Sequence, residues 1–319
     1  MRHFNHILCV TSADEHQRSL LERAFSLAEN NQARLTCVET VAEVPPGVRS
    51  WLGSVSGVDA TERLRAERLA ALQTFVGQCA GQRPCTCRVL VGAPYVEIIR
   101  AVPREGYDLV LKQAEDPGFL PRLFGGDDMH LFRKCPCPVW LTKPGGSNNY
   151  ATVLAAVDFE TAEMPEELTG INRDILSLAG SIALSDFATL HILHVWDTPG
   201  EGLIRAWSEA PETTVLHYVE GERQRRQRGM ELLQRQLATL LDEQALGYLA
   251  PQFHLVRGTA AEAIPATAAR LGADLVALGS AGRTGIAGAI VGNTAEAVFE
   301  QLQCAVLAIK PRDFVSPIQ

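Results

Sequence analysis

The sequence predicts an α/β protein built from two tandem repeats, each a doubly wound, five-stranded parallel sheet in a Rossmann-like three-layer α/β/α arrangement. Short β-rich runs alternate with helical periods along the chain, which is typical of βαβ crossovers. Several of these runs, such as 153–157 and 275–278, are continuously apolar, as are strands buried on both faces of a parallel sheet. The two halves of the chain also match each other in sequence, which predicts that the same fold occurs twice.

The internal repeat sets the number of domains. Matching pairs of segments are 6–11 with 152–158, 108–110 with 274–276, and 137–144 with 304–311. The second copy carries about 20 extra residues between its second and third strands. A polar linker at 145–149 separates the copies, so we expect domains at 1–145 and 150–313.

Each repeat carries five expected strands. In the first repeat they lie at 6–12, 34–41, 86–91, 108–113 and 138–142, and in the second at 152–159, 189–196, 253–257, 273–279 and 305–310. Helices lie between them, and one apolar stripe is formed by Met230, Leu233, Leu237, Leu240 and Leu241. Ligands of such sheets bind beyond the carboxyl ends of the strands, so the residues that follow strands are the candidate site.

Composition excludes several classes of protein. The 319 residues are 46% hydrophobic and 21% charged, with a formal net charge of −8. A net negative chain is repelled by nucleic acid, and no apolar run reaches the roughly 18 residues that a membrane helix needs. The first residues have no secretory signal pattern. We therefore expect a cytoplasmic protein with no membrane span and no nucleic-acid partner.

Cysteines and histidines favour packing over metal binding. The eight cysteines are expected to be reduced, and the C-x-C spacings at 85–87 and 135–137 differ from the C-x2-C of zinc ribbons. His191 and His194 point to opposite faces of their strand. A metal at His130, beside Asp127 and Asp128, is a weaker alternative.

A glycine-rich loop follows the fourth strand of the second repeat. It begins at Gly279, contains Gly282, Gly285, Gly288 and Gly292, and leads into a helix expected at 295–301. Glycines let the backbone approach a phosphate closely, and a helix start attracts anions. The alternative is a mobile connection, with Asn293 or Thr294 as the helix cap. The sequence contains neither G-x-G-x-x-G nor G-x4-G-K-[ST].

The spacing Gly279-x2-Gly282-x9-Gly292, before a polar residue and a helix, resembles the ATP-binding signature of the universal stress protein superfamily. The stretches 127–140 and 282–296 resemble its tandem, two-domain E-type branch. This resemblance implies an adenine nucleotide alpha hydrolase-like fold. It also implies that the two copies pack through their last strands, 138–142 and 305–310, and that the chain forms a homodimer.

The resemblance further implies a nucleotide site in the second repeat for ATP, or ADP or AMP, with Mg²⁺ or Mn²⁺. An Asp at the end of the first strand faces the nucleotide, the backbone ending the second strand brackets adenine, and the loop meets the ribose and phosphates. The residues implied are Asp158, Val195, Gly279, Gly282, Arg283, Gly292, Asn293 and Thr294. Asn293 stands where many members have Ser or Thr, and Asn can also donate to a phosphate.

The first repeat departs from this pattern. Thr11 stands in place of the strand-end Asp, and the first two glycines of the signature are missing. Acidic residues occupy the place of the phosphates, and Lys112 is expected to balance one of them. These acidic residues are Glu115, Asp116, Asp127 and Asp128. We expect that this repeat does not bind ATP in the same way.

The favoured function is a nucleotide-binding regulatory module without assigned catalytic or metal-ligating residues. The alternatives are a slow metal-dependent ATPase or hydrolase, using His130 or acids of the first repeat, and a scaffold without ligand. Two further features stay open. The arginines at 223, 225, 226 and 228 are expected to begin a long helix as a solvated face. Trp51 and Trp207 are expected either to line a groove or to seal the contact between the domains.

Overall fold

The computed structural model describes residues 4–48, 50, 59–115, 126–146, 149–159, 170–241, 243–280 and 293–318. The chain forms two compact units. We call His3–Asn149 together with Ser280–Gln319 the N-unit, and Tyr150–Gly279 together with residues 1–2 the C-unit. The N-unit therefore contains the first repeat and the last segment of the second repeat.

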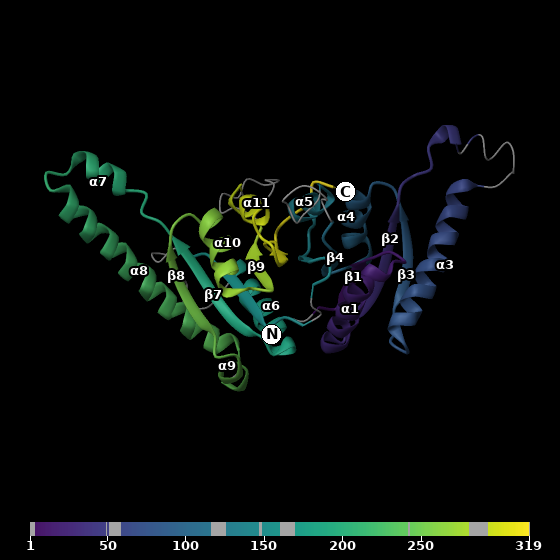
Figure 1. Cartoon of the computed structure of the whole chain (residues 1–319), viewed down its shortest axis with the longest axis horizontal. Helices are drawn as coiled ribbons and strands as arrows, with labels where there is room; N and C mark the ends of the chain where they lie inside the picture. Colours follow the sequence, from purple (N-terminus) through teal and green to yellow (C-terminus); the bar gives the residue numbers. More distant parts are fainter. Residues whose placement is uncertain are drawn as a thin grey trace. The chain divides into compact units, whose positions relative to one another are not determined.

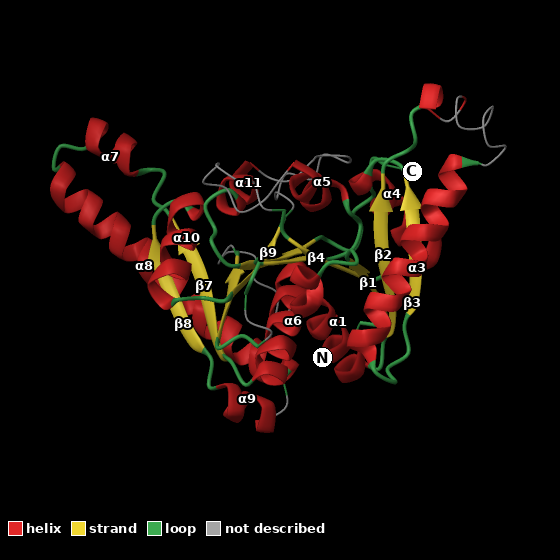
Figure 2. Cartoon of the chain, turned by 45° about the vertical axis from the view of Figure 1, so that its right-hand side comes forward, coloured by secondary structure: helices red, strands yellow, loops and turns green. Residues whose placement is uncertain are grey.

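The N-unit is a largely parallel sheet with the strand order β3-β2-β1-β4-β5-β10. Its strands are β1 (His6–Val10), β2 (Arg34–Val41), β3 (Thr86–Val91), β4 (Leu109–Gln113), β5 (Val139–Thr142) and β10 (Ala305–Ile309). Its helices are the 3-10 turn η1 (Glu15–Gln17), α1 (Arg18–Asn31), α3 (Ala60–Ala80), α4 (Pro94–Glu105), α5 (Gly126–Lys134) and α11 (Asn293–Phe299). Helix α1 packs with α3, and α4 packs with α5, so helices flank the sheet (Figure 2).

The C-unit is a parallel sheet with the strand order β9-β6-β7-β8. Its strands are β6 (Thr152–Val157), β7 (Thr189–Trp196), β8 (Gln252–Arg257) and β9 (Leu275–Gly279). Its helices are α6 (Gly170–Asp186), α7 (Glu201–Trp207), α8 (Pro211–Leu240), α9 (Glu243–Leu249) and α10 (Ala260–Leu271). Figure 1 shows that the long helix α8 continues past the ends of β7 and β8 and carries α7 at its tip.

The local sequence explains why the same elements occur twice. Strands β1 and β10 are buried along their whole length, as their continuous apolar runs predict. Helices α4 and α10 both end at a glycine in the left-handed region, Gly106 at φ 71° and Gly272 at φ 61°, a conformation that glycine adopts without strain. The carboxylates of Asp108 and Asp274 accept backbone N–H groups at the starts of β1 and β6, including His6 N and Thr152 N at 3.0 Å each.

All ten predicted strands are present, and the predicted α/β class is confirmed. The predicted pairing of the last strands is also confirmed, because β5 and β10 pair antiparallel with Leu141 opposite Val306. The apolar stripe of α8 is confirmed as well, with Met230, Leu233 and Leu237 buried. No helix in the described part of the chain is long and apolar enough to cross a bilayer.

Three expectations need correction. The register pairs Ile7 with Leu109 and Val153 with Leu275, so the equivalent of Asp158 in the first repeat is Ser12 and not Thr11. A match based on residue types misplaces the strand end by one position, which strand pairing resolves. The arginine cluster at 223–228 does not begin α8, because this helix begins at Pro211. The expected helix at 295–301 is α11, which begins two residues earlier at Asn293.

Candidate functional site

Three of the predicted site residues lie at one edge of the C-unit sheet. Asp158 follows β6, Val195 lies near the end of β7, and Gly279 ends β9. Strand β6 pairs with β7 on one side and with β9 on the other. Because parallel strands end at the same edge, the structure brings these three residues together at the carboxyl edge of neighbouring strands.

The turn after β6 is held by a side chain from the first turn of α6. Asn172 Oδ1 accepts the Asp158 N–H at 3.2 Å, and Asn172 Nδ2 donates to the Asp158 carbonyl oxygen at 2.7 Å. Both polar backbone groups of Asp158 are therefore bonded to one amide side chain. The Asp158 side chain itself is 63% exposed, so its carboxylate is presented to solvent from a fixed backbone.

Two further residues hold the same turn, which spans 157–159. His194 Nδ1 donates to the Val157 carbonyl oxygen at 3.2 Å, and the imidazole stacks on Phe159 with ring centroids 3.8 Å apart. The same nitrogen lies 3.9 Å from Asp158 Oδ1. Arg226 Nη1 donates to the Phe159 carbonyl oxygen at 3.2 Å. The turn is thus fixed from α6, β7 and α8 at once.

Gly279 has a packing reason for lacking a side chain. A Cβ at this position would lie 2.6 Å from Ile171 Cδ1 in α6, closer than real contacts allow. The predicted residues Gly282, Arg283 and Gly292 lie outside the described residues. Asn293 is the first residue of α11, and Thr294 is exposed in its first turn. Both belong to the N-unit.

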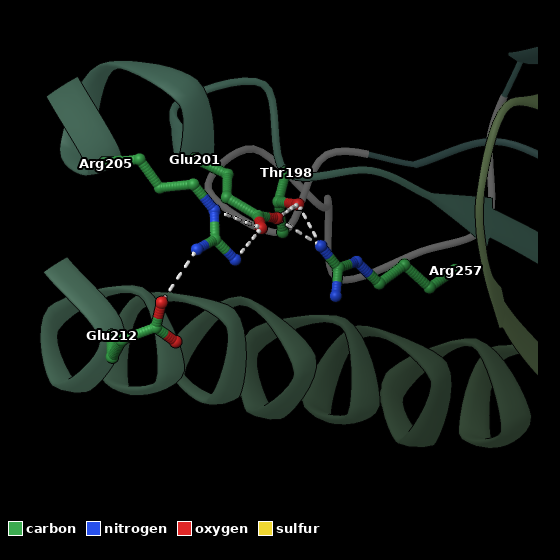
Figure 3. Close-up of polar contacts among 5 residues, drawn as sticks. All are labelled: Thr198, Glu201, Arg205, Glu212 and Arg257. Carbon is green, nitrogen blue, oxygen red and sulfur yellow. Dashed lines mark hydrogen bonds and ion pairs between the residues drawn. The ribbon is translucent and has the colours of Figure 1, made fainter.

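A polar network borders the same edge of the C-unit at the ends of β7 and β8 (Figure 3). Arg257, the last residue of β8, donates to Thr198 Oγ1 at 2.8 Å and to Glu201. Glu201 also accepts from Arg205 at 3.0 Å, and Arg205 reaches Glu212 of α8 at 3.5 Å. Arg205 also lowers the pKa of Glu201 by donating to its carboxylate. The network ties α7 to β8 and α8.

The corresponding edge of the N-unit is occupied by an ion pair. Lys112, in β4, donates to Asp128 Oδ1 at 2.6 Å, and the Asp128 carboxylate is fully buried. Asp128 Oδ2 accepts the Glu115 N–H at 2.7 Å. Burial raises the pKa of Glu115, whose carboxylate lies 3.3 Å from Lys112 Nζ. The expectation that Lys112 balances an acid is therefore confirmed.

The structure gives no support to a metal site in the part of the chain it describes, where no three metal-ligating side chains cluster. His130 stacks on Tyr95 with ring centroids 4.2 Å apart. His191 Nδ1 lies 2.9 Å from His254 Nε2, whereas His194 contacts Phe159, as opposite faces of β7 require.

All eight cysteines are free thiols. Burial raises the pKa of Cys87 to about 11. A hydrogen bond with Cys37 is the main cause of the raised pKa of Cys85. Thiols held in the protonated form are weak nucleophiles and weak ligands.

The family follows from the sequence. The profile of the universal stress protein family matches residues 3–143 and 171–310. This chain therefore belongs to the universal stress protein family. It is similar to universal stress protein E of Escherichia coli K12, at 33% identity over 233 residues that cover 71% of this chain and 68% of that protein. Universal stress protein E of Photorhabdus laumondii is 26% identical over 324 aligned positions, covering 100% of this chain and 99% of that protein.

Solved structures agree with this assignment. A Pseudomonas aeruginosa structure, described as a candidate universal stress protein, is 26% identical with a TM-score of 0.64 and covers 97% of this chain and 94% of that chain. A universal stress protein from Archaeoglobus fulgidus has a TM-score of 0.60 at 18% identity, with 97% of this chain and 98% of that chain covered, and shows the shared fold. The predicted tandem family is confirmed.

Sequence reasoning missed the residues that hold the Asp158 turn. Asn172 lies 14 residues after Asp158, inside a helix, where nothing in the pattern marks it. Arg226 was expected to belong to a solvated face, together with Arg223 and Arg225. That expectation fits these two exposed arginines, but Arg226 is only 21% exposed because it reaches the turn.

Proposed function

We propose that this chain is an adenine-nucleotide-binding regulatory protein that holds ATP, ADP or AMP at the carboxyl edge of the C-unit. The observation that carries the proposal is the turn 157–159, which three side chains fix while the Asp158 carboxylate stays exposed. A carboxylate presented in this way accepts hydrogen bonds from nucleoside hydroxyl or amino groups, and a preorganised group loses little entropy on binding.

The contrast between the repeats supports the same assignment. In the N-unit the equivalent strand-end residue is Ser12, and Lys112 and Asp128 are already bonded to each other. A nucleotide there would have to break a buried ion pair. The C-unit has a leucine, Leu278, at the position of Lys112, so no such pair competes with a ligand.

The remaining predicted residues complete the proposal. Val195 supplies backbone groups beside adenine, and the loop from Gly279 supplies N–H groups to the ribose and phosphates through Gly282, Arg283, Gly292, Asn293 and Thr294. The nucleotide brings Mg²⁺ or Mn²⁺ with it, held by its phosphates, as is usual for Mg²⁺ at phosphate-binding sites. The bound state is read through conformation or through partner contacts.

The test begins with the purified chain, denatured so that any nucleotide it retains is released and identified by mass spectrometry. Titration calorimetry of the nucleotide-free chain with ATP, ADP and AMP follows. Gly282→Val and Gly292→Val should each raise the dissociation constant at least tenfold, about 1.4 kcal/mol, with an unchanged circular dichroism spectrum. Gly126→Val, at the start of α5 in the first repeat, is the matched control and should bind normally.

Two outcomes would contradict the proposal. A wild-type chain that neither retains nor binds an adenine nucleotide would favour a scaffold without ligand. Normal binding by both loop variants would place the nucleotide elsewhere. Phosphate release from ATP with Mg²⁺ or Mn²⁺, measured on the same samples, decides whether the bound nucleotide is also slowly hydrolysed.

A further inference from the structure

Helix α8 has two halves with different surroundings. Its second half packs on the sheet and buries Gly229, Met230, Leu233, Gln236 and Leu237. Between Pro211 and Arg228 this fully described helix buries one residue, Val215. That half is about 27 Å long at 1.5 Å per residue, and with α7 it projects beyond β7 and β8 in Figures 1 and 2. We call residues 201–228 the projecting hairpin.

The projecting hairpin exposes large apolar side chains. Leu203 is 59% exposed, Trp207 is 83% exposed and Leu216 is 68% exposed. The first two lie four residues apart, on one face of α7. Trp207 therefore lies in a helix and on the surface of the described structure. Helices in water owe most of their stability to a packed apolar face, and clustered exposed apolar residues mark interaction sites.

Polar contacts tie the two helices of the hairpin to each other and to β8. Glu201 and Arg205 of α7, Glu212 of α8 and Arg257 of β8 are joined in one network (Figure 3). A side chain at Gly200 would also lie 3.1 Å from the Tyr218 hydroxyl of α8, which shows how closely the two segments approach. These contacts order α7 against α8 and β8, which lowers the backbone entropy that binding has to remove.

Acidic and basic residues are separated along the axis of helix α8 and the two residues that precede it. The stretch 209–222 carries acidic residues and no Lys or Arg, at Glu209, Glu212, Glu220 and Glu222. The stretch 223–240 carries five arginines and one acid, at Arg223, Arg225, Arg226, Arg228, Arg235 and Glu231. This distribution complements itself when two such helices lie antiparallel. Helix α3 of the first repeat does not share it, because acidic and basic residues are intermixed at Glu62, Arg63, Arg65 and Glu67.

We propose that the projecting hairpin binds helix α8 of a second copy of this chain, with the two α8 helices antiparallel across a two-fold axis near Glu222 and Arg223. Each acidic stretch then faces the partner's basic stretch. The dipoles of the two antiparallel helices point in opposite directions, which is a favourable arrangement. The exposed apolar residues of α7 reach the partner's second half of α8. An interface of this kind is isologous and closed, so the product is a dimer.

The test measures the mass of the full chain in solution by sedimentation velocity and light scattering, at low and at high salt. The wild type should be a dimer that dissociates more readily at high salt, because rim charges are screened. Arg223→Glu with Arg228→Glu leaves the stretch 223–240 with three arginines and three acids. Glu212→Arg with Glu220→Arg leaves the stretch 209–222 with two arginines and two acids. Each variant therefore loses one of the two opposite net charges that the antiparallel pairing needs. Each double variant should be monomeric, with a dissociation constant raised at least tenfold.

Mixing the two variants tests the antiparallel arrangement directly. An equimolar mixture should again form dimers, because the acidic stretch that the first variant keeps then faces the basic stretch that the second variant keeps. Arg63→Glu with Arg65→Glu in α3 is the matched control and should stay dimeric. The altered residues are exposed, so unchanged circular dichroism confirms folding. A monomeric wild type, dimers unaffected by both reversals, or a mixture that stays monomeric would each overturn the proposal.

Discussion

Lys112 Nζ lies 2.6 Å from Asp128 Oδ1 in the N-unit, where the repeat relationship would place a ligand. The same carboxylate bonds the Glu115 N–H through its other oxygen. Asp128, a residue of α5, therefore connects this helix to the end of β4 through one bond to Lys112 and one to the Glu115 N–H. A bound anion would accept hydrogen bonds from the same two groups. One repeat has an internal acid at this edge, whereas the other presents Asp158 to solvent.

Removing the acid of this pair should destabilise the chain strongly. Asp128→Ala removes the fully buried partner of the Lys112 ammonium, which is 12% exposed, and leaves it only the more exposed Glu115 carboxylate. Breaking a buried pair in this way costs about 3–5 kcal/mol. Urea unfolding measures the change. Lys112→Met with Asp128→Leu removes both charges and should cost less than the single change. A single variant within about 0.5 kcal/mol of the wild type would show that the pair is not buried in solution.

Asn172→Ala should weaken nucleotide binding although Asn172 is placed outside the ligand's contacts. The two hydrogen bonds to Asp158 are lost, so the carboxylate loses its fixed backbone, and we expect a dissociation constant raised about 5- to 20-fold, or 1–2 kcal/mol. Calorimetric titration with ATP measures it. Gln17→Ala, at the corresponding helix start of the first repeat, is the control and should bind like the wild type.

The sequence predicted the strands well because their signal is local. Continuous apolar runs such as 153–157 and the glycines that end α4 and α10 need no knowledge of distant contacts. The strand-end assignment failed by one residue at Thr11, because register is decided by pairing with β4 and not by residue type. Contacts between distant elements, such as Arg226 with Phe159, leave no periodic trace and were missed.

Gly279→Ala separates packing from ligand approach. The new Cβ would lie 2.6 Å from Ile171 Cδ1, but this atom ends a flexible side chain and can rotate away, so the cost in unfolding free energy should be about 1 kcal/mol or less. If the loop approaches a nucleotide at this residue, affinity for ATP should nevertheless fall about tenfold. Adding Ile171→Val removes the clashing atom and should restore stability but not affinity. Recovery of both would assign Gly279 to packing alone.

The His191–His254 pair should make the chain less stable in acid. Burial lowers the pKa of His191 below its ordinary 6.5, with His254 and Arg270 lowering it further, and burial and Arg270 likewise lower the pKa of His254. In the unfolded chain the pKa values of both histidines return to their ordinary values. As the pH falls below about 6.5 the unfolded state therefore binds protons before the folded state does, and the free energy of unfolding falls. Above this pH the histidines are neutral in both states, so the pair adds no pH dependence to the stability.

His191→Gln with His254→Gln should flatten the pH profile of the free energy of unfolding between about pH 7.5 and 5.5 relative to the wild type, measured by urea unfolding at each pH. Parallel profiles for the two proteins would mean that the histidines titrate normally in the folded chain, and hence that water reaches the 2.9 Å contact between their rings.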